Sequence, residues 1–289
     1  MYNESKLLML GLRGSGKTTF LAALWHHVEA DELGGRLMLP QLQPDRDYLN
    51  AVRNNWLSLK PVERTSMRSN NEVSLDLLDR KTNAHVSMTL PDLSGETFRL
   101  QWATRKAPRA YVEFARECTG AFLFVHPNEV AKTHVIKPES IDLESDAEDQ
   151  HQIQVVPSVN WTPAQTSTQV QLVDVLQLLL RMRSIRQKMR LAVTVSAWDL
   201  VRGRIPPSVW LEKRLPMLSQ FVRSNSDKLT SEVFGLSAQG GDLSADRDAL
   251  LHGEVPSKRC YAVSGNSLDH VPFLAPLQFL IDDNELRTR

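Results

Sequence analysis

The chain has few cysteines, no excess of either charge and no long apolar run, and each of these shortages excludes a class of protein. Cys118 and Cys260 are the only cysteines among 289 residues. Two thiols without a CxxC pair make neither a disulfide scaffold nor a zinc site, and they fit a reducing compartment. Lysine plus arginine (34) equals aspartate plus glutamate (34), so no global field favours nucleic acid as a partner.

A membrane span is also missing from the sequence, because no apolar stretch approaches the roughly 18 residues that a span needs. The apolar run near the N-terminus is too short for a secretion signal and leads directly into a glycine-rich loop. We therefore expect a cytoplasmic protein without a transmembrane segment. Apolar residues make up 42 % of the chain, which is ordinary for a globular protein with a sizeable core.

That glycine-rich loop, residues 11–18, has the sequence Gly-Leu-Arg-Gly-Ser-Gly-Lys-Thr. It matches G-x-x-x-x-G-K-[ST], the phosphate-binding loop of nucleoside triphosphatases. Glycine lets the backbone curl so that successive N–H groups point at phosphate oxygens. Lys17 would bring a positive charge to the β- and γ-phosphates, and the Thr18 hydroxyl would ligate Mg²⁺. The predicted nucleotide-binding residues of this loop are Gly11, Gly14, Ser15, Gly16, Lys17, Thr18 and Thr19.

The residues on either side of the loop provide the setting that this motif requires. A short apolar run at residues 6–10 predicts a buried parallel strand. After the loop, Phe20, Leu21, Leu24 and Val28 recur at helical spacing. Strand, glycine loop and helix in this order direct the positive end of the helix dipole at the phosphates.

Strand-like runs and helical patterns alternate along the rest of the chain. The later strand-like runs are 72–78, 85–90, 121–125, 191–195 and 233–236. The helical patterns are 108–117, 166–186 and 207–222. The first two runs predict an antiparallel hairpin, and the others predict parallel strands. The order predicts an α/β fold of the P-loop NTPase type, with a Ras-like three-layer α/β/α arrangement and a mostly parallel six-stranded sheet.

Two segments stand apart from this alternation. Residues 127–165 contain several prolines and an acidic cluster from Glu139 to Asp149. A segment of this length without periodicity is either a disordered insertion or a functional lobe, and we expect a surface insertion between a core strand and the long helix. Residues 240–289 predict an extension packed on the core, with a short strand and a closing helix.

A second motif, D-x-x-G, follows the strand that ends at Leu90. In a P-loop fold this strand lies beside the first one, so Asp92 would reach the Mg²⁺, through a metal-bound water or by orienting Thr18. Gly95 has no side chain, and its N–H can meet a γ-phosphate oxygen. Loss of that phosphate would release the following loop, as in a nucleotide-controlled switch.

A third motif concerns the base. Ser196, Ala197, Trp198 and Asp199 follow a core strand, where [NT]-K-x-D would select guanine. Guanine presents two adjacent donors, N1–H and the 2-amino group, and a carboxylate accepts both. The motif is degraded, because Ser196 and Ala197 replace the amide or threonine and the lysine. The alternative is that Asp199 caps the next helix.

A loop after the last apolar strand supports the guanine interpretation. It contains Ser237, Ala238 and Gln239, and a backbone N–H there can reach guanine O6. The predicted base-binding residues are Ser196, Trp198, Asp199, Ser237 and Ala238.

These sites, in this order, resemble the TRAFAC class of GTPases over roughly residues 5–239, with the insertion excluded. The chain is most similar to the bacterial double-GTPase family of conflict systems. The stretches behind that closer resemblance end at Leu24, Glu96, Pro127, Gln177 and Leu280: Gly-Ser-Gly-Lys-Thr-Thr-Phe-Leu-Ala-Ala-Leu, Asp-Leu-Ser-Gly-Glu, Phe-Val-His-Pro, Leu-Val-Asp-Val-Leu-Gln and Pro-Leu-Gln-Phe-Leu. The resemblance implies a single GTPase domain over residues 1–289, GTP or GDP with Mg²⁺, and a protein partner that is a second GTPase, an activating protein or an effector.

Two departures from the class affect hydrolysis. Glu96 stands where Ras-like proteins have the glutamine that positions the attacking water. A carboxylate there is repelled by the γ-phosphate, yet it can accept a proton from water. Arg13 replaces a small residue of the phosphate loop, and it would either supply charge in cis or face solvent or a partner. The predicted catalytic residues are therefore Arg13, Lys17, Gly95 and Glu96.

A hydroxyl before the hairpin should complete the Mg²⁺ shell, which would then include Thr18 and Asp92. The candidates are Thr65, Ser66 and Ser69, and Thr65 is the nearest chemical match. An ordinary hydroxyl in a polar loop is the alternative.

The sequence thus predicts a GTP-binding, Mg²⁺-dependent switch with slow intrinsic hydrolysis. Three alternatives remain at this point: a module that binds GTP without turnover, an ATPase, and a scaffold subunit.

Overall fold

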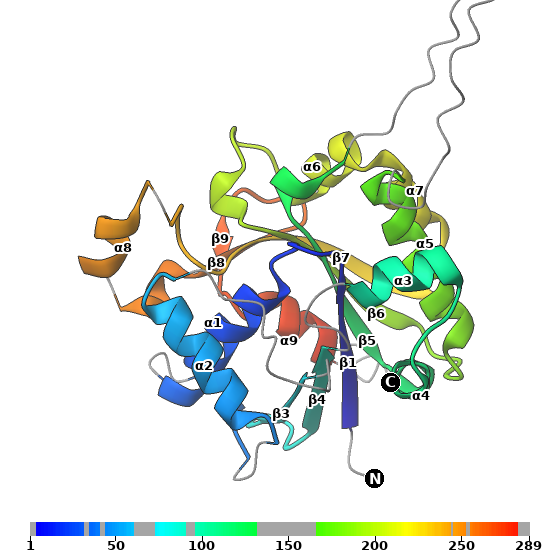
Figure 1. Cartoon of the computed structure of the whole chain (residues 1–289), viewed down its shortest axis with the longest axis horizontal. Coiled ribbons are helices and arrows are strands. Elements are labelled where there is room, and N and C mark those ends of the chain that lie inside the picture. The colour runs from blue at the N-terminus through cyan, green and yellow to red at the C-terminus, as the bar shows by residue number, and fades with distance from the viewer. Residues whose placement is uncertain are drawn as a thin grey trace, which may run out of the picture.

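A mixed sheet is the central feature of the fold (Figure 1). The computed structural model describes residues 4–31, 35–40, 44–60, 73–90, 96–131, 166–243, 245–252 and 255–282, and the backbone alone of residues 96, 97, 99 and 100. Within these ranges nine strands follow the order β2-β3-β4-β1-β5-β6-β7-β8-β9. Their bounds are Glu4–Gly11 (β1), Leu37–Met38 (β2), Val73–Asp79 (β3), His85–Leu90 (β4), Gly120–Val125 (β5), Met189–Ser196 (β6), Leu229–Ser237 (β7), Tyr261–Ser264 (β8) and His270–Val271 (β9).

Parallel pairing joins β4, β1, β5, β6 and β7, whereas β2, β3, β8 and β9 pair antiparallel at the two edges. The predicted α/β class and the hairpin of β3 and β4 are confirmed. The expected count of six strands is too low. The two-residue strands β2 and β9 are too short to produce a sequence pattern, and β8 belongs to the segment that we expected to pack on the core as an extension.

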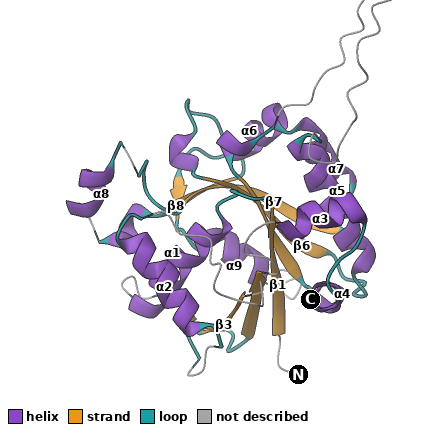
Figure 2. Cartoon of the chain, viewed as in Figure 1, coloured by secondary structure: helices purple, strands orange, loops and turns teal. Residues whose placement is uncertain are grey.

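Helices cover both faces of the sheet (Figure 2). One apolar cluster lies between the sheet and α1 (Lys17–Ala30), α2 (Arg46–Leu57) and α9 (Ala275–Ile281). The other lies between the sheet and α3 (Glu96–Thr104), α4 (Arg109–Glu117), α5 (Thr168–Met182), α6 (Pro207–Arg214) and α7 (Pro216–Ser224). The short helix α8 spans Arg247–His252. Burial of apolar surface on both faces is the dominant stabilising term for such a layered fold.

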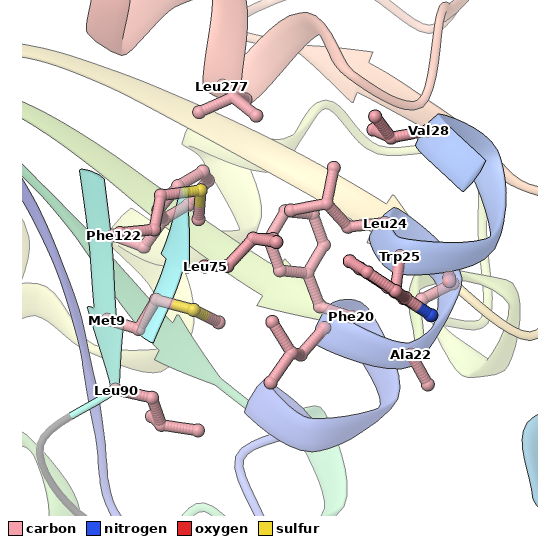
Figure 3. Packing of buried hydrophobic residues seen from close by; sticks show 14 of the residues in the cluster. Met9, Phe20, Ala22, Leu24, Trp25, Val28, Leu75, Leu90, Phe122 and Leu277 are labelled. Atoms are coloured by element: carbon pink, nitrogen blue, oxygen red, sulfur yellow. The ribbon is translucent and has the colours of Figure 1, made fainter. Parts of the chain in front are cut away.

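The start of α1 is fixed on the sheet by Phe20, which lies among buried apolar side chains (Figure 3). The ring of Phe20 is fully buried, and its centroid lies 5.1 Å from that of Phe122, 5.3 Å from that of Phe124 and 5.5 Å from that of Phe273. Offset and tilted aromatic pairs at these distances are favourable. Because Phe20 follows the phosphate-loop motif by two residues, this packing also fixes the motif relative to β5.

The predicted helix over residues 207–222 is divided into α6 and α7. The break comes at Leu215, whose backbone is not helical (φ −137°, ψ 60°), and Pro216 begins α7. Proline disfavours a helical conformation in the residue before it and donates no backbone hydrogen bond. The apolar periodicity continues across the break, so periodicity alone predicted one helix.

A partly buried ion pair joins the segment after α1 to the edge of the sheet and to the end of α9. Arg36 donates to both carboxylate oxygens of Asp79, with Nε–Oδ1 at 2.7 Å and Nη2–Oδ2 at 2.5 Å, and its Nη1 lies 2.5 Å from Asp282 Oδ1. Asp79 is only 2 % exposed. Burial alone would raise the pKa of Asp79, but the hydrogen bonds from Arg36, Thr82 and Lys81 prevail and lower it to about 2.

Replacing Asp79 with asparagine should lower the free energy of unfolding at pH 7 by about 2–3 kcal/mol, because Arg36 keeps its charge and loses its bidentate partner. The ionised Asp79 stabilises the fold fully above the ordinary carboxyl pKa of 3.8, and this contribution is lost as the pH falls towards 2. Denaturant unfolding between pH 7 and 2 should therefore show that the free energy of unfolding falls more steeply on acidification for wild type than for Asp79→Asn.

The matched control is Asp31→Asn, because Asp31 pairs with Arg80 at the surface. Exposed pairs contribute little, so this variant should unfold almost as wild type does. Equal stability of Asp79→Asn and Asp31→Asn would contradict the importance assigned to the Arg36 cluster.

Candidate functional site

The carboxyl ends of the parallel strands meet at one edge of the sheet, where the predicted motifs come together. The register pairs Gly11 with Phe124, Val125 with Val195, and Ser196 with Leu236. The loops that follow β1, β5, β6 and β7 therefore start at the same level. In open α/β sheets this edge is where ligands bind.

The phosphate-loop motif lies between β1 and α1, and its glycines are required by close contacts. A Cβ at Gly11 would lie 2.6 Å from Ser15 Oγ and 2.7 Å from the Phe124 carbonyl oxygen. At Gly16, where φ is +88°, a Cβ would lie 2.8 Å from Cβ and Oγ of Ser196. The loop thus packs directly against the strand that carries the third motif.

Lys17 is held over this loop. Its Nζ donates to the carbonyl oxygens of Gly11 at 2.7 Å and Leu12 at 3.0 Å, and to Ser15 Oγ at 3.2 Å. Only 4 % of Lys17 is exposed. Three acceptors offset the cost of burying an ammonium group. They also hold a positive charge at the mouth of the loop.

The N-terminus of α1 is suited to an anion. Gly16 is its N-cap residue and supplies no side-chain cap, and the first turn contains no acidic residue. The first N–H groups of a helix have no partner within the helix, and the helix dipole is positive at this end. Thr18 and Thr19, both partly buried, belong to this turn. The exposed Arg13 and Gly14 form the outer part of the loop, with Gly14 next to Glu129.

A cavity of about 410 Å³ adjoins the phosphate loop. Its lining includes the predicted residues Gly16, Thr19, Ser196, Asp199 and Ala238. Three motifs that lie as far apart in the chain as residues 16 and 238 thus share one cavity. Its volume is within the usual range for a small-molecule ligand.

Asp199 lies in a short 3₁₀ helix, Trp198–Leu200, directly after β6. Its Oδ1 atom is buried and has no hydrogen-bond partner among the described residues. A buried acceptor without a donor costs free energy, and a ligand with adjacent N–H donors would remove that cost. The alternative interpretation of Asp199 as a helix cap is wrong, because α6 begins at Pro207 with Pro206 as its N-cap residue.

Trp198 lies differently from Asp199. Its indole packs against β7, where a Cβ at Gly235 would lie 2.2 Å from the ring. Trp198 is absent from the described lining of the 410 Å³ cavity and lines a smaller neighbouring one. Ala197, which precedes it, adopts the left-handed conformation (φ 46°, ψ 48°). On either side of this turn, Ser196 and Asp199 line the 410 Å³ cavity, whereas Trp198 does not belong to its described lining.

The loop after β7 is held in place by hydrogen bonds to its backbone. The Ala238 carbonyl accepts from Trp56 Nε1 at 2.8 Å and from Cys260 Sγ at 3.3 Å. Burial raises the pKa of Cys260 to about 12, so the thiol keeps its proton. In a trans peptide the next N–H, that of Gln239, points opposite to this carbonyl. Ser237 is fully buried, and its Oγ accepts from the Gly240 N–H at 3.0 Å.

His126 and Lys60 are among the lining residues that were absent from the sequence-based prediction. His126 Nδ1 accepts from the Asn128 N–H at 3.2 Å, so the neutral ring carries its proton on Nε2. Burial lowers the pKa of His126, while Glu129 and Asp199 act in the opposite sense. Its position directly after β5 was the available signal. For Lys60 there was no such sequence signal, because it follows a helix rather than a core strand.

Several predicted residues lie outside the described ranges, namely Thr65, Asp92 and Gly95. Glu96 is the first residue of α3, and its backbone alone is described. Thr18 is therefore the one predicted Mg²⁺ ligand whose place the structure describes. No group of three or more His, Cys, Asp or Glu suited to a metal ion occurs within the described ranges. None of the helices described is long and apolar enough to span a membrane.

The chain matches one family model in sequence, and solved structures match it with low TM-scores. The model of the family Double-GTPase 1 matches residues 8–269. No curated protein matches. Among solved structures, a bacterial selenocysteine-specific elongation factor, EF-Sec, covers 86 % of the chain at 12 % identity (TM-score 0.35), and the chain spans 28 % of it. The signal recognition particle receptor SRb-GTP/SRX complex from Chaetomium thermophilum covers 86 % of the chain at 13 % identity (TM-score 0.38), and the chain spans 95 % of it.

Proposed function

The chain belongs to the Double-GTPase 1 family, and we propose that it is a GTP-binding switch that hydrolyses GTP slowly with Mg²⁺. The observation that carries the choice of base is the buried Asp199 Oδ1, which lacks a donor among the described residues and lines the same cavity as Gly16 of the phosphate loop. Guanine offers two adjacent N–H donors to a carboxylate, and adenine offers no such pair. A guanine nucleotide would therefore supply N–H donors to Asp199 at one end of the cavity and phosphate groups to the loop at the other.

The phosphate end is supported by the chain's own groups. Lys17 and the N-terminus of α1 supply positive charge, and the loop glycines leave no Cβ where the backbone must approach an anion. Thr18 would ligate Mg²⁺ together with Asp92 and Thr65, which lie in segments outside the described ranges. Held by these residues, an Mg²⁺ ion would neutralise the charge that develops on the phosphate oxygens during hydrolysis.

Turnover is proposed to depend on Glu96, the first residue of α3, and on Gly95, which precedes it in the sequence. Gly95 would donate its N–H to the γ-phosphate, and Glu96 would be adjacent to the attacking water. Arg13 is exposed on the loop, where it would meet a partner or add charge to the transition state. Hydrolysis would be slow because the negative Glu96 carboxylate disfavours the negative charge of the transition state.

We place this switch in the cytoplasm, in a bacterial multi-protein system of the conflict or defence type. Its protein partner would be a second GTPase, an activating protein or an effector. In this proposal residues 1–289 act as one GTPase domain, with the insertion at 127–165 on its surface. Nucleotide-dependent rearrangement after the D-x-x-G motif is the means by which the partner would sense the bound state.

Asp199→Asn should shift the preference from guanine to xanthine nucleotides. The asparagine amide donates to the C2 carbonyl of xanthine, where aspartate accepted from the 2-amino group of guanine. GTP affinity should fall by roughly 30- to 1000-fold, which corresponds to ~2–4 kcal/mol. Calorimetric titration with GTP, XTP and ATP measures all three affinities. Asp227→Asn, an exposed change before β7, is the control, and an unaltered GTP affinity in Asp199→Asn would contradict the base assignment.

Intrinsic turnover of wild type should be on the order of 10⁻⁴ to 10⁻² per second, the range of unassisted relatives of Ras. Glu96→Gln then separates two mechanisms. A faster variant means that the carboxylate hinders the water, whereas a variant slower by ~10²–10⁴ means that Glu96 is the base. Single-turnover phosphate release from preloaded GTP measures both rates. Absence of release from wild type and variant, with and without lysate of the source cell, would contradict hydrolysis and leave a GTP-binding module.

A further inference from the structure

Lys60 lies at the end of a surface helix, yet it lines the same cavity as Gly16, Thr19 and Asp199. It is the one lysine or arginine among the described residues of that lining. The cavity otherwise carries the acidic side chains of Asp199 and Asp242, and His126, whose pKa burial lowers. At the position where the guanine motif would have a lysine, this chain has Ala197.

The backbone holds Lys60 in place through a defined helix ending. The Lys60 N–H donates to the Asn55 carbonyl at 2.9 Å, and the Leu59 N–H donates to the Trp56 carbonyl at 3.2 Å. These two bonds, with a left-handed residue between Ser58 and Lys60, form a Schellman motif. Lys60 is therefore fixed by the end of α2, and only its side chain is free to move.

The left-handed residue of this motif is Leu59, with φ +52°. Glycine is usual at this position, because a Cβ is unfavourable in the left-handed conformation. Leu59 is 1 % exposed, and its carbonyl accepts from Arg247 Nη1 at 2.9 Å. Burial and this hydrogen bond hold the strained turn in place. Strain of this kind tends to occur where a functional residue must be positioned.

The same helix end is tied to the base end of the cavity. Trp56 donates its indole N–H to the Ala238 carbonyl at 2.8 Å, and Arg259 lies over the Trp56 ring at 4.5 Å from its centroid. Arg259 also donates to the Trp56 carbonyl at 3.5 Å. Lys60 is thus placed relative to Ala238 through buried contacts, although it is itself exposed.

We propose that Lys60 is a nucleotide-binding residue, whose ammonium group pairs with an oxygen of the bound guanine nucleotide and supplies the positive charge that Ala197 lacks. This proposal rests on the proposed function, because it deepens the same site. Four methylene groups let the ammonium reach into the cavity from α2, and the cavity contains two carboxylates that favour a cation there.

Lys60→Met tests the charge, because methionine keeps an unbranched stem of similar length. Affinity for GTP and for GDP should each fall by about 10-fold or more, the loss of one charge-assisted hydrogen bond at a partly solvated site. Lys60→Arg should recover most of the affinity. The difference between wild type and Lys60→Met should shrink at high salt, since an exposed charge is screened. Calorimetric titration with each nucleotide at low and high salt measures these effects.

Lys81→Met is the matched control. Lys81 is an exposed lysine in the turn between β3 and β4. This turn lies at the end of the sheet opposite to the carboxyl ends of the parallel strands, so loss of the lysine should leave GTP affinity unchanged. Thermal unfolding without nucleotide should be the same for wild type, Lys60→Met and Lys81→Met, which excludes damage to α2 as the cause. If wild type binds GTP and Lys60→Met binds it equally well, the inference is overturned while the proposed function stands. If wild type binds no guanine nucleotide, the proposed function itself fails.

Discussion

The contact between Gly16 and Ser196 is the constraint on which the site depends. A Cβ on Gly16 would lie 2.8 Å from the Ser196 side chain, so the phosphate loop and the end of β6 approach as closely as backbone geometry permits. Gly16 is the N-cap residue of α1, and Ser196 is the last residue of β6, directly before the turn that carries Asp199. The spacing between the proposed phosphate-binding and base-binding ends is therefore limited by one glycine, and a bound nucleotide would span that spacing.

A second set of contacts holds the far wall of the cavity. The Ala238 carbonyl is bound by Trp56 from α2 and by Cys260, which precedes β8. Arg247 and Arg259 bind backbone carbonyls at the end of α2. The residues after β7 thus stabilise the position of α2 against the base loop. The segment in which we expect the first switch follows α2 in the sequence and lies outside the described ranges.

The sequence predicted those parts of the structure that depend on local patterns. Lys17 and Asp199 follow buried strands and stand in recognisable motifs, so their common position followed from parallel pairing. Lys60 reaches the cavity through tertiary packing that no sequence spacing records, whereas His126 directly follows a core strand and could have been predicted from that position. The division of residues 207–222 at Pro216 was visible in the sequence but was outweighed by continuous apolar periodicity. The left-handed Leu59 could not be predicted, because burial and Arg247 stabilise it against its own propensity.

The most direct test of a guanine nucleotide bound between Lys17 and Asp199 is an equilibrium titration of the purified wild-type chain with GTP, GDP, ATP and ADP, with and without Mg²⁺. GTP and GDP should bind at least roughly 30-fold more tightly than the adenine nucleotides, the equivalent of ~2 kcal/mol for the paired donors on Asp199. Mg²⁺ should strengthen the binding of GTP. Equal affinities for guanine and adenine nucleotides, or no binding of either, would contradict a guanine site at Asp199.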